Sequence, residues 1–293
     1  MVLDAQPLYR LAHSTREPSM TAVATKLDID SRYALSAEQI GFFRENGYIK
    51  LKQVLSPEVL AYYGPAITKK VLELNRNTLP MAERTTYNKA FIQVGNLWTK
   101  CDTVKEFVFG KRLARIAAEL LGVTGVRMWH DQALYKEPSG GFTPWHADQY
   151  YWPMASEKSV TAWIPHQATP LEMGPLAFAR KSHTFECGRD LKISDESEVQ
   201  ISKAMHDQGF QYVEEPFELG EVSFHYGWTF HRAGPNVTDR AREVMTIIYM
   251  DEDMRLKQPT NDNQMSDWKA WCPGTQIGAV MKTHLNPVIY SSR

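Results

Sequence analysis

The chain has 293 residues, 43% of them hydrophobic, and a formal net charge of −1 at pH 7. Its length and apolar content allow it to bury a full hydrophobic core. Its near-neutral charge argues against binding to nucleic acid or to an anionic membrane surface. The sequence has no apolar run long enough to span a membrane and no secretory signal at its beginning, so we expect a cytoplasmic protein.

The cysteines agree with a reducing compartment. Cys101, Cys187 and Cys272 are odd in number and share no C-x-x-C spacing. We interpret them as reduced thiols, not as a disulfide framework or a zinc site. Residues 1–32 show no sustained hydrophobic period and are expected to form a poorly ordered N-terminal extension. Residues 33–293 are then expected to form a single domain.

The first part of this domain carries helical signals. We predict three helical regions, with the polar residues Ser36, Ser56 and Asp102 as their N-terminal caps. The first region ends at Gly47 and the third at Gly122, because glycine readily adopts the left-handed conformation that ends many helices.

After residue 124 the sequence changes to short β-type runs separated by Gly and Pro. The runs cover residues 126–135, 143–151, 160–165, 176–179, 221–225, 229–231 and 242–250. Such a series favours an antiparallel sandwich or barrel. With the preceding helices it predicts an α+β, mainly β fold, in which N-terminal helices flank a jelly-roll, cupin-like core. The charged, irregular stretch 181–216 is a candidate lid or insertion.

Three residues have the chemistry of metal ligands. His146 and Asp148 stand two positions apart in Trp-His-Ala-Asp, so on a strand their side chains share one face. His231 supplies a third donor from much later in the chain. Two imidazoles and one carboxylate on one side of an iron ion leave the other positions open, as in non-heme Fe(II) oxygenases.

Other histidines compete for this role. His225 would face the same side as His231, but it lacks the Gly-Pro-Asn turn that follows His231. We interpret it as a neighbour of the ligands or a core residue. His130 is adjacent to Asp131, which points the two side chains to opposite faces. His183 follows Lys-Ser and is interpreted as structural.

Arg242 is the candidate anchor for a dicarboxylate cosubstrate. A planar guanidinium pairs bidentately with a carboxylate and keeps its charge when buried. The alternative, Arg240, lies in the turn before the strand, where a solvated surface charge is the simpler explanation. We prefer Arg242 because a residue that begins a strand can point into the core.

Together these residues resemble the phytanoyl-CoA dioxygenase family of Fe(II)- and 2-oxoglutarate-dependent oxygenases, over roughly residues 35–290. The resemblance is carried by residues 42–48, 144–148, 163–165, 174–176, 182–183, 231–236 and 286–287. It implies a double-stranded β-helix core, iron held by His146, Asp148 and His231, and 2-oxoglutarate anchored by Arg242. It also implies a cosubstrate pocket lined by Gln93, Gln132, Thr143 and Trp163.

The resemblance further implies a dioxygenase that uses Fe(II), 2-oxoglutarate and O2 to oxidise an unactivated C–H bond. Related halogenases have Gly or Ala in place of Asp148, so this carboxylate favours hydroxylation, desaturation or rearrangement. The residue between the proximal ligands is Ala147, where the family usually has Gln. Family membership does not name the substrate.

Aromatic residues near the ligands bear on the substrate. If the strand continues past Asp148, Tyr150 and Trp152 project to the ligand side, with Phe142 and Trp228 nearby. These rings would suit a largely apolar small molecule, such as a natural product or a lipid-like metabolite. The alternative is that they belong to the ordinary core.

Two other functions compete with the dioxygenase. A cupin-type metal enzyme without 2-oxoglutarate is disfavoured by the lack of a His-x-His pair and by Arg242. A non-catalytic metal-binding protein is disfavoured by the complete set of three ligands and one anchor. Exposed strand edges would be compatible with a homodimer.

Overall fold

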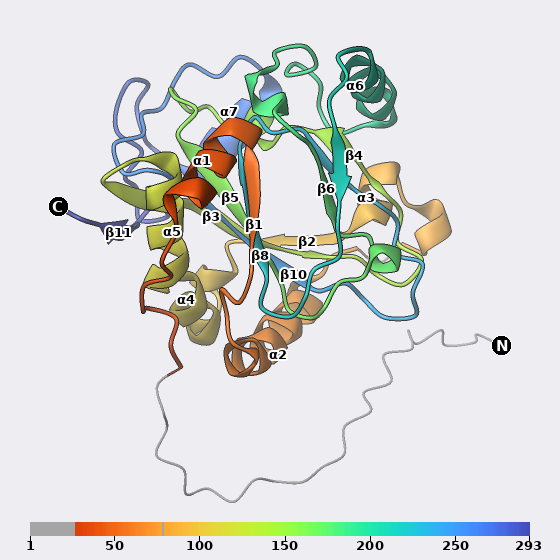
Figure 1. The fold of residues 1–293 in the computed structure, drawn as a ribbon, viewed down its shortest axis with the longest axis horizontal. Helices are drawn as coiled ribbons and strands as arrows, with labels where there is room; N and C mark the ends of the chain where they lie inside the picture. The colour runs from red at the N-terminus through yellow and green to blue at the C-terminus, as the bar shows by residue number, and fades with distance from the viewer. Residues whose placement is uncertain (1–26, 78) are drawn as a thin grey trace, which may run out of the picture.

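The computed structural model describes residues 27–77 and 79–293, which form two antiparallel sheets with helices around them (Figure 1). The larger sheet has the strand order β1-β8-β5-β10-β3-β11, and β2 pairs with β3 outside this path. Its strands are β1 (Tyr48–Leu51), β2 (Ile92–Gly95), β3 (Gly125–Tyr135), β5 (Ser159–Pro165), β8 (Val222–Tyr226), β10 (Val244–Asp251) and β11 (Val288–Ser291).

The smaller sheet has the order β4-β9-β6-β7. Its strands are β4 (Thr143–His146), β6 (Leu176–Ala179), β7 (Tyr212–Glu214) and β9 (His231–Ala233). The predicted α+β, mainly β fold with a jelly-roll core is confirmed, although the described strands do not join into one closed barrel. The run expected over residues 143–151 is shorter than predicted, because β4 ends at His146 and a 3-10 helix (Asp148–Tyr151) follows.

Seven α-helices occur in the described residues. They are α1 (Ala37–Asn46), α2 (Pro57–Leu74), α3 (Thr86–Ala90), α4 (Asp102–Val108), α5 (Lys111–Leu121), α6 (Asp195–Asp207) and α7 (Asp262–Trp271). Ser36 and Ser56 cap α1 and α2 as predicted. The third region is two helices, α4 and α5, and Asp102 is the first residue of α4, not its cap. None of these helices is both long and apolar enough to cross a membrane.

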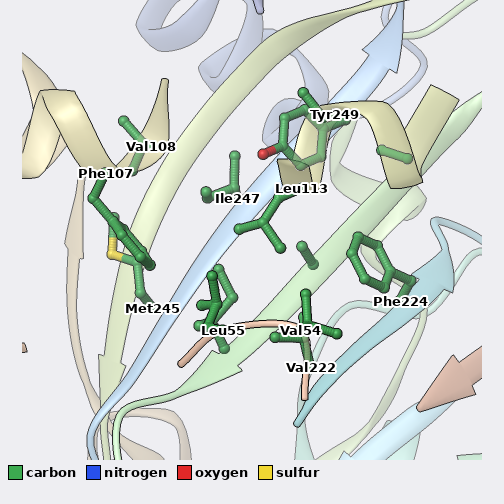
Figure 2. Close-up of a cluster of buried hydrophobic side chains, with 14 of the residues drawn as sticks. Val54, Leu55, Phe107, Val108, Leu113, Val222, Phe224, Met245, Ile247 and Tyr249 are labelled. Carbon is green, nitrogen blue, oxygen red and sulfur yellow. The ribbon is translucent and has the colours of Figure 1, made fainter. Parts of the chain in front are cut away.

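One face of the larger sheet forms the main hydrophobic core with α4 and α5. Figure 2 shows Phe107 and Leu113 from these helices beside Met245, Ile247 and Tyr249 of β10. All five side chains are nearly or fully buried. Because side chains alternate along a strand, the residues between them point to the opposite face of the sheet. That opposite face is where the pocket described below is formed.

Part of the expected N-terminal extension, residues 1–26, lies outside the described residues. Residues 27–32 lie against α5: Ile29 is buried, its carbonyl accepts a 3.0 Å hydrogen bond from the Arg112 amide, and Asp28 pairs with the Arg112 side chain at 2.5 Å. The stretch 181–216 is more regular than expected, since it contains α6 and β7. It is tied to β4 by the Glu198 carboxylate, which accepts the Trp145 amide at 2.9 Å.

Asp131 joins β3 to the segment that follows β2. Its fully buried carboxylate accepts hydrogen bonds from the amides of Leu97 (2.7 Å) and Trp98 (3.0 Å). We expect Asp131→Ala to lower the free energy of unfolding by about 2–4 kcal/mol, because two amides lose their acceptor. Urea denaturation measures this, with the exposed Asp239→Ala as the control. If Asp131→Ala loses no more unfolding free energy than Asp239→Ala does, the Asp131 carboxylate does not stabilise the fold in this way.

Candidate metal centre and its pocket

Strand pairing in the smaller sheet brings two histidines together. His146 ends β4, His231 begins β9, and the two residues are direct partners in the register. Their ring centroids are 4.1 Å apart, and both side chains are buried. Asp148 comes from the 3-10 helix that follows β4, not from a continued strand. The bend in the chain at the end of β4 therefore brings the carboxylate to the same place as the two imidazoles.

The three side chains have the separations expected of a set of metal ligands. Asp148 Oδ1 lies 3.5 Å from His146 Nε2 and 3.6 Å from His231 Nε2. The three ligand atoms all lie within 4.8 Å of one another. A metal ion can therefore reach one atom of each residue.

Backbone carbonyls fix which ring nitrogen faces this centre. His146 Nδ1 lies 2.8 Å from the Pro144 carbonyl, and His231 Nδ1 lies 2.9 Å from the Thr229 carbonyl. A carbonyl can only accept, so each Nδ1 carries the proton and each Nε2 presents a lone pair. This is the tautomer that a histidine ligand needs, and a hydrogen bond of this kind also fixes the orientation of the ring.

The second oxygen of Asp148 is engaged by the protein. Thr161 donates its hydroxyl to Asp148 Oδ2 at 2.9 Å, and His225 Nε2 lies 3.3 Å from the same atom. Oδ1 is thus left to face the two ligand histidines. The structure places His225 beside the ligands, where the sequence interpretation put it.

The charges in this cluster favour deprotonated ligands. Burial tends to raise the pKa of Asp148, but His231, His146 and His225 outweigh it and hold that pKa well below its usual value. Burial, followed by His146 and His225, lowers the pKa of His231 far below its usual value. An ionised carboxylate and a neutral imidazole are the states that bind a metal ion.

The ligands line a cavity of about 380 Å³ on the inner face of the larger sheet. The four residues expected around a cosubstrate all line this cavity: Gln93, Gln132, Thr143 and Trp163. Gln93 donates to the Gln132 side chain at 2.5 Å and accepts from the Tyr87 hydroxyl, also at 2.5 Å. A chain of polar groups therefore runs along one wall of the cavity.

Arg242 lines the same cavity and is 2% exposed. Its Nη1 donates to the Gly174 carbonyl at 2.5 Å, and its guanidinium lies 5.4 Å from the centre of the Trp163 ring. Burial lowers the pKa of Arg242 to about 9, so the side chain is still cationic at neutral pH.

Two buried donors beside the cavity have no acceptor. These are Arg242 Nε and Trp163 Nε1, and no carboxylate among the described residues forms an ion pair with Arg242. A buried cation without an ion-pair partner is costly, and the carboxylate of a ligand would supply one. Arg240, the alternative anchor, is exposed and does not line the cavity.

Only one of the four aromatic residues expected near the substrate lines the cavity. Trp152 lines the cavity, whereas Tyr150, Phe142 and Trp228 do not, so the expectation for these three is wrong. It assumed that the strand continues past Asp148. In the 3-10 helix that forms instead, residues three apart share a face, so Tyr151 is the residue that joins Asp148 at the cavity.

The three misplaced rings have other contacts. Tyr150 accepts a hydrogen bond from the Asn263 side chain at 3.2 Å. Phe142 lies beneath the Arg232 guanidinium at 5.9 Å, and Trp228 lies beneath Arg189 at 4.5 Å.

Sequence reasoning missed two groups of lining residues. The first comes from the strands of the larger sheet and includes Thr161 and Thr246, which the alternation within the predicted strands could have identified. The second comes from α3 and the residue after it, from α7 and from the segment before α6, and consists of Tyr87, Phe91, Ile193, Asp267 and Trp271. These residues reach the cavity through long-range packing, for which the sequence holds no local signal.

Comparison with known proteins agrees with this architecture. A probable alpha-ketoglutarate-dependent hypophosphite dioxygenase of Stutzerimonas stutzeri is 24% identical over 237 residues, which cover 74% of this chain and 79% of that protein. The non-heme alpha ketoglutarate dependent carbocyclase SnoK from nogalamycin biosynthesis has a similar structure (TM-score 0.71, 24% identity, 87% of this chain and 97% of that chain).

A second solved structure is the epimerase SnoN in complex with Fe3+, alpha ketoglutarate and nogalamycin RO (TM-score 0.71, 24% identity, 86% of this chain and 98% of that chain). EctD from S. alaskensis with 2-oxoglutarate and 5-hydroxyectoine is similar as well (TM-score 0.66, 18% identity, 94% of this chain and 97% of that chain). At sequence identities of 24% or less, these solved structures support the assignment of the fold alone. The model of the phytanoyl-CoA dioxygenase (PhyH) family matches residues 43–244, more than half of the chain, and the chain therefore belongs to this family.

Proposed function

We propose that this protein is an Fe(II)- and 2-oxoglutarate-dependent dioxygenase that oxidises an unactivated C–H bond of a largely apolar small molecule. The observation that carries the proposal is one cavity that holds both a His146–Asp148–His231 ligand set and the buried guanidinium of Arg242, which forms no ion pair with a described residue. The alpha-ketoglutarate dependence in the names of the relatives supports the same cosubstrate. The nogalamycin pathway of two of them supports a natural-product substrate.

Each side chain has a defined part in this proposal. His146 and His231 give their Nε2 lone pairs to the metal, and Asp148 gives Oδ1. Iron held there supplies, with 2-oxoglutarate and O2, the oxidising power that breaks a C–H bond. Arg242 pairs with the distal carboxylate of 2-oxoglutarate, and Trp163 offers its indole N–H beside it.

Other lining residues position these groups and keep out water. Thr161 and His225 hold Asp148 Oδ2, so the carboxylate keeps one orientation. Gln93, Gln132 and Thr143 supply polar contacts to the cosubstrate in this proposal. The rings of Trp152 and Tyr151 exclude water from the substrate side of the cavity.

The two competing functions explain fewer of these features. A cupin-type enzyme without 2-oxoglutarate or a non-catalytic metal-binding protein would have no use for the buried guanidinium of Arg242. The proposal includes a single catalytic domain over residues 33–293 and a cytoplasmic location, which the three free cysteines favour. A homodimer remains a prediction from the sequence.

The proposal is tested by anaerobic titration with Fe(II) and then 2-oxoglutarate. We expect a charge-transfer band in the visible spectrum, whose growth gives the affinity for 2-oxoglutarate. Arg242→Lys should weaken that affinity about tenfold or more, because lysine lacks the bidentate fork. Arg240→Lys is the matched control and should behave as the wild type. Absence of the band in the wild type, or equal affinities for the two variants, would refute the assignment.

The contact between Thr161 and Asp148 gives a second test. Thr161→Val keeps the shape of the side chain but removes the hydroxyl that holds Asp148 Oδ2. We expect the affinity for Fe(II) to fall about 10–100-fold, as for other groups that orient metal ligands. Thr161→Ser keeps the hydroxyl and should restore most of the affinity in the same titration. If the Thr161→Val variant binds Fe(II) as tightly as the Thr161→Ser variant does, the hydroxyl does not orient Asp148 for metal binding.

A further inference from the structure

One carboxylate in the cavity has no part in the proposed reaction. Asp267 lies on α7, is half-buried and lines the cavity together with three aromatic side chains, Tyr87, Phe91 and Trp271. The cavity lining contains no lysine, and its one arginine is Arg242, which the proposal above assigns to 2-oxoglutarate.

The aromatic side chains around Asp267 are held in place. The Trp271 ring lies 4.8 Å from the His130 ring at an interplanar angle of 31°. A Cβ atom on Gly95 would come within 2.9 Å of the Trp271 ring, so the glycine allows the indole to lie close against β2. Tyr87 and Phe91 meet edge to face at 5.2 Å. These contacts hold the three rings in place, and all three line the cavity together with the carboxylate.

The charge on Asp267 is not balanced by the part of the chain that the structure describes. Burial raises the pKa of Asp267 to about 7, a hydrogen bond from Trp271 opposes the shift, and no lysine or arginine contributes. Burial also lowers the pKa of the neighbouring His130 to about 4, so this imidazole is neutral near pH 7. A carboxylate in such surroundings is stabilised by a ligand of positive charge.

We propose, on the basis of the dioxygenase function above, that Asp267 and the rings of Tyr87, Phe91 and Trp271 bind a positively charged nitrogen of the substrate. The carboxylate pairs with the charge, and the ring faces attract it through cation–π interactions. The substrate class is therefore an apolar skeleton that carries a protonated amine. This narrows the substrate class, which the sequence predicts only as a largely apolar small molecule.

Tyr87 lies close enough to Asp267 and to the metal ligand Asp148 for both charges to act on its hydroxyl. Burial, then Asp267, then Asp148 raise the pKa of Tyr87 to about 12, so its hydroxyl lies within the field of both carboxylates. The same hydroxyl begins the chain of hydrogen bonds through Gln93 to Gln132. A nitrogen bound at Asp267 thus lies in the same cavity as the metal centre, and its binding would fix which C–H bond faces the metal.

A pair of probes of similar size and different charge tests the ammonium site. We would load the protein with Zn(II), which is diamagnetic and redox-inert, and with 2-oxoglutarate, and titrate 2-phenylethylamine and 2-phenylethanol at pH 7.5. Ligand-observed NMR gives the two dissociation constants. The wild type should bind the amine about tenfold more tightly than the alcohol, as expected for one charge-assisted contact.

Variants of one helix provide the controls. Asp267→Asn should abolish the preference for the amine and leave the affinity for the alcohol unchanged. Asp262→Asn changes an exposed residue in the first turn of α7 and should keep the preference. Thermal unfolding of both variants shows that they are folded.

Equal affinities of the wild type for the two probes, or a preference that survives Asp267→Asn, would overturn the ammonium site. The titration measures binding without turnover. The ammonium site can therefore be refuted while the protein still consumes 2-oxoglutarate. It can also be supported while the dioxygenase assignment is refuted.

Discussion

The alternation of side chains along the larger sheet is the constraint on which the rest of the structure depends. On β10, Met245, Ile247 and Tyr249 pack against the helices, so Thr246 between them lines the cavity on the other face. β5 behaves in the same way, since Ala162 belongs to the core and its neighbours belong to the cavity. The hydrophobic face that stabilises the fold therefore also fixes the positions of the polar groups on the opposite face.

The cavity contains several polar groups that the protein leaves only partly satisfied. The ligand histidines use Nδ1 for backbone carbonyls and keep Nε2 free, and Asp148 uses one oxygen for Thr161 and His225. Arg242 and Trp163 keep donors without acceptors. Unsatisfied buried groups destabilise a fold, and the carboxylate of a ligand in the cavity would give these two donors an acceptor.

The sequence was sufficient to predict the local features of the fold. It was not sufficient to predict the features that depend on contacts between residues far apart in the chain. Ser36, Ser56 and the alternating runs predicted the caps and most strands, because these signals act within a few residues. The prediction failed at Tyr150, where a 3-10 helix replaces the expected strand and turns Tyr151 to the cavity. Asp267 could not have been found, because α7 reaches the cavity only through tertiary packing.

The most direct test of the central claim is an anomalous diffraction map of crystals grown without oxygen in the presence of Fe(II). The account predicts one iron peak per chain, bonded to His146 Nε2, His231 Nε2 and Asp148 Oδ1. His225 Nε2 lies only 3.3 Å from the other oxygen of Asp148, which makes it the natural competitor. A peak bonded to His225 in place of His146 or His231, or a peak outside the cavity, would contradict the account.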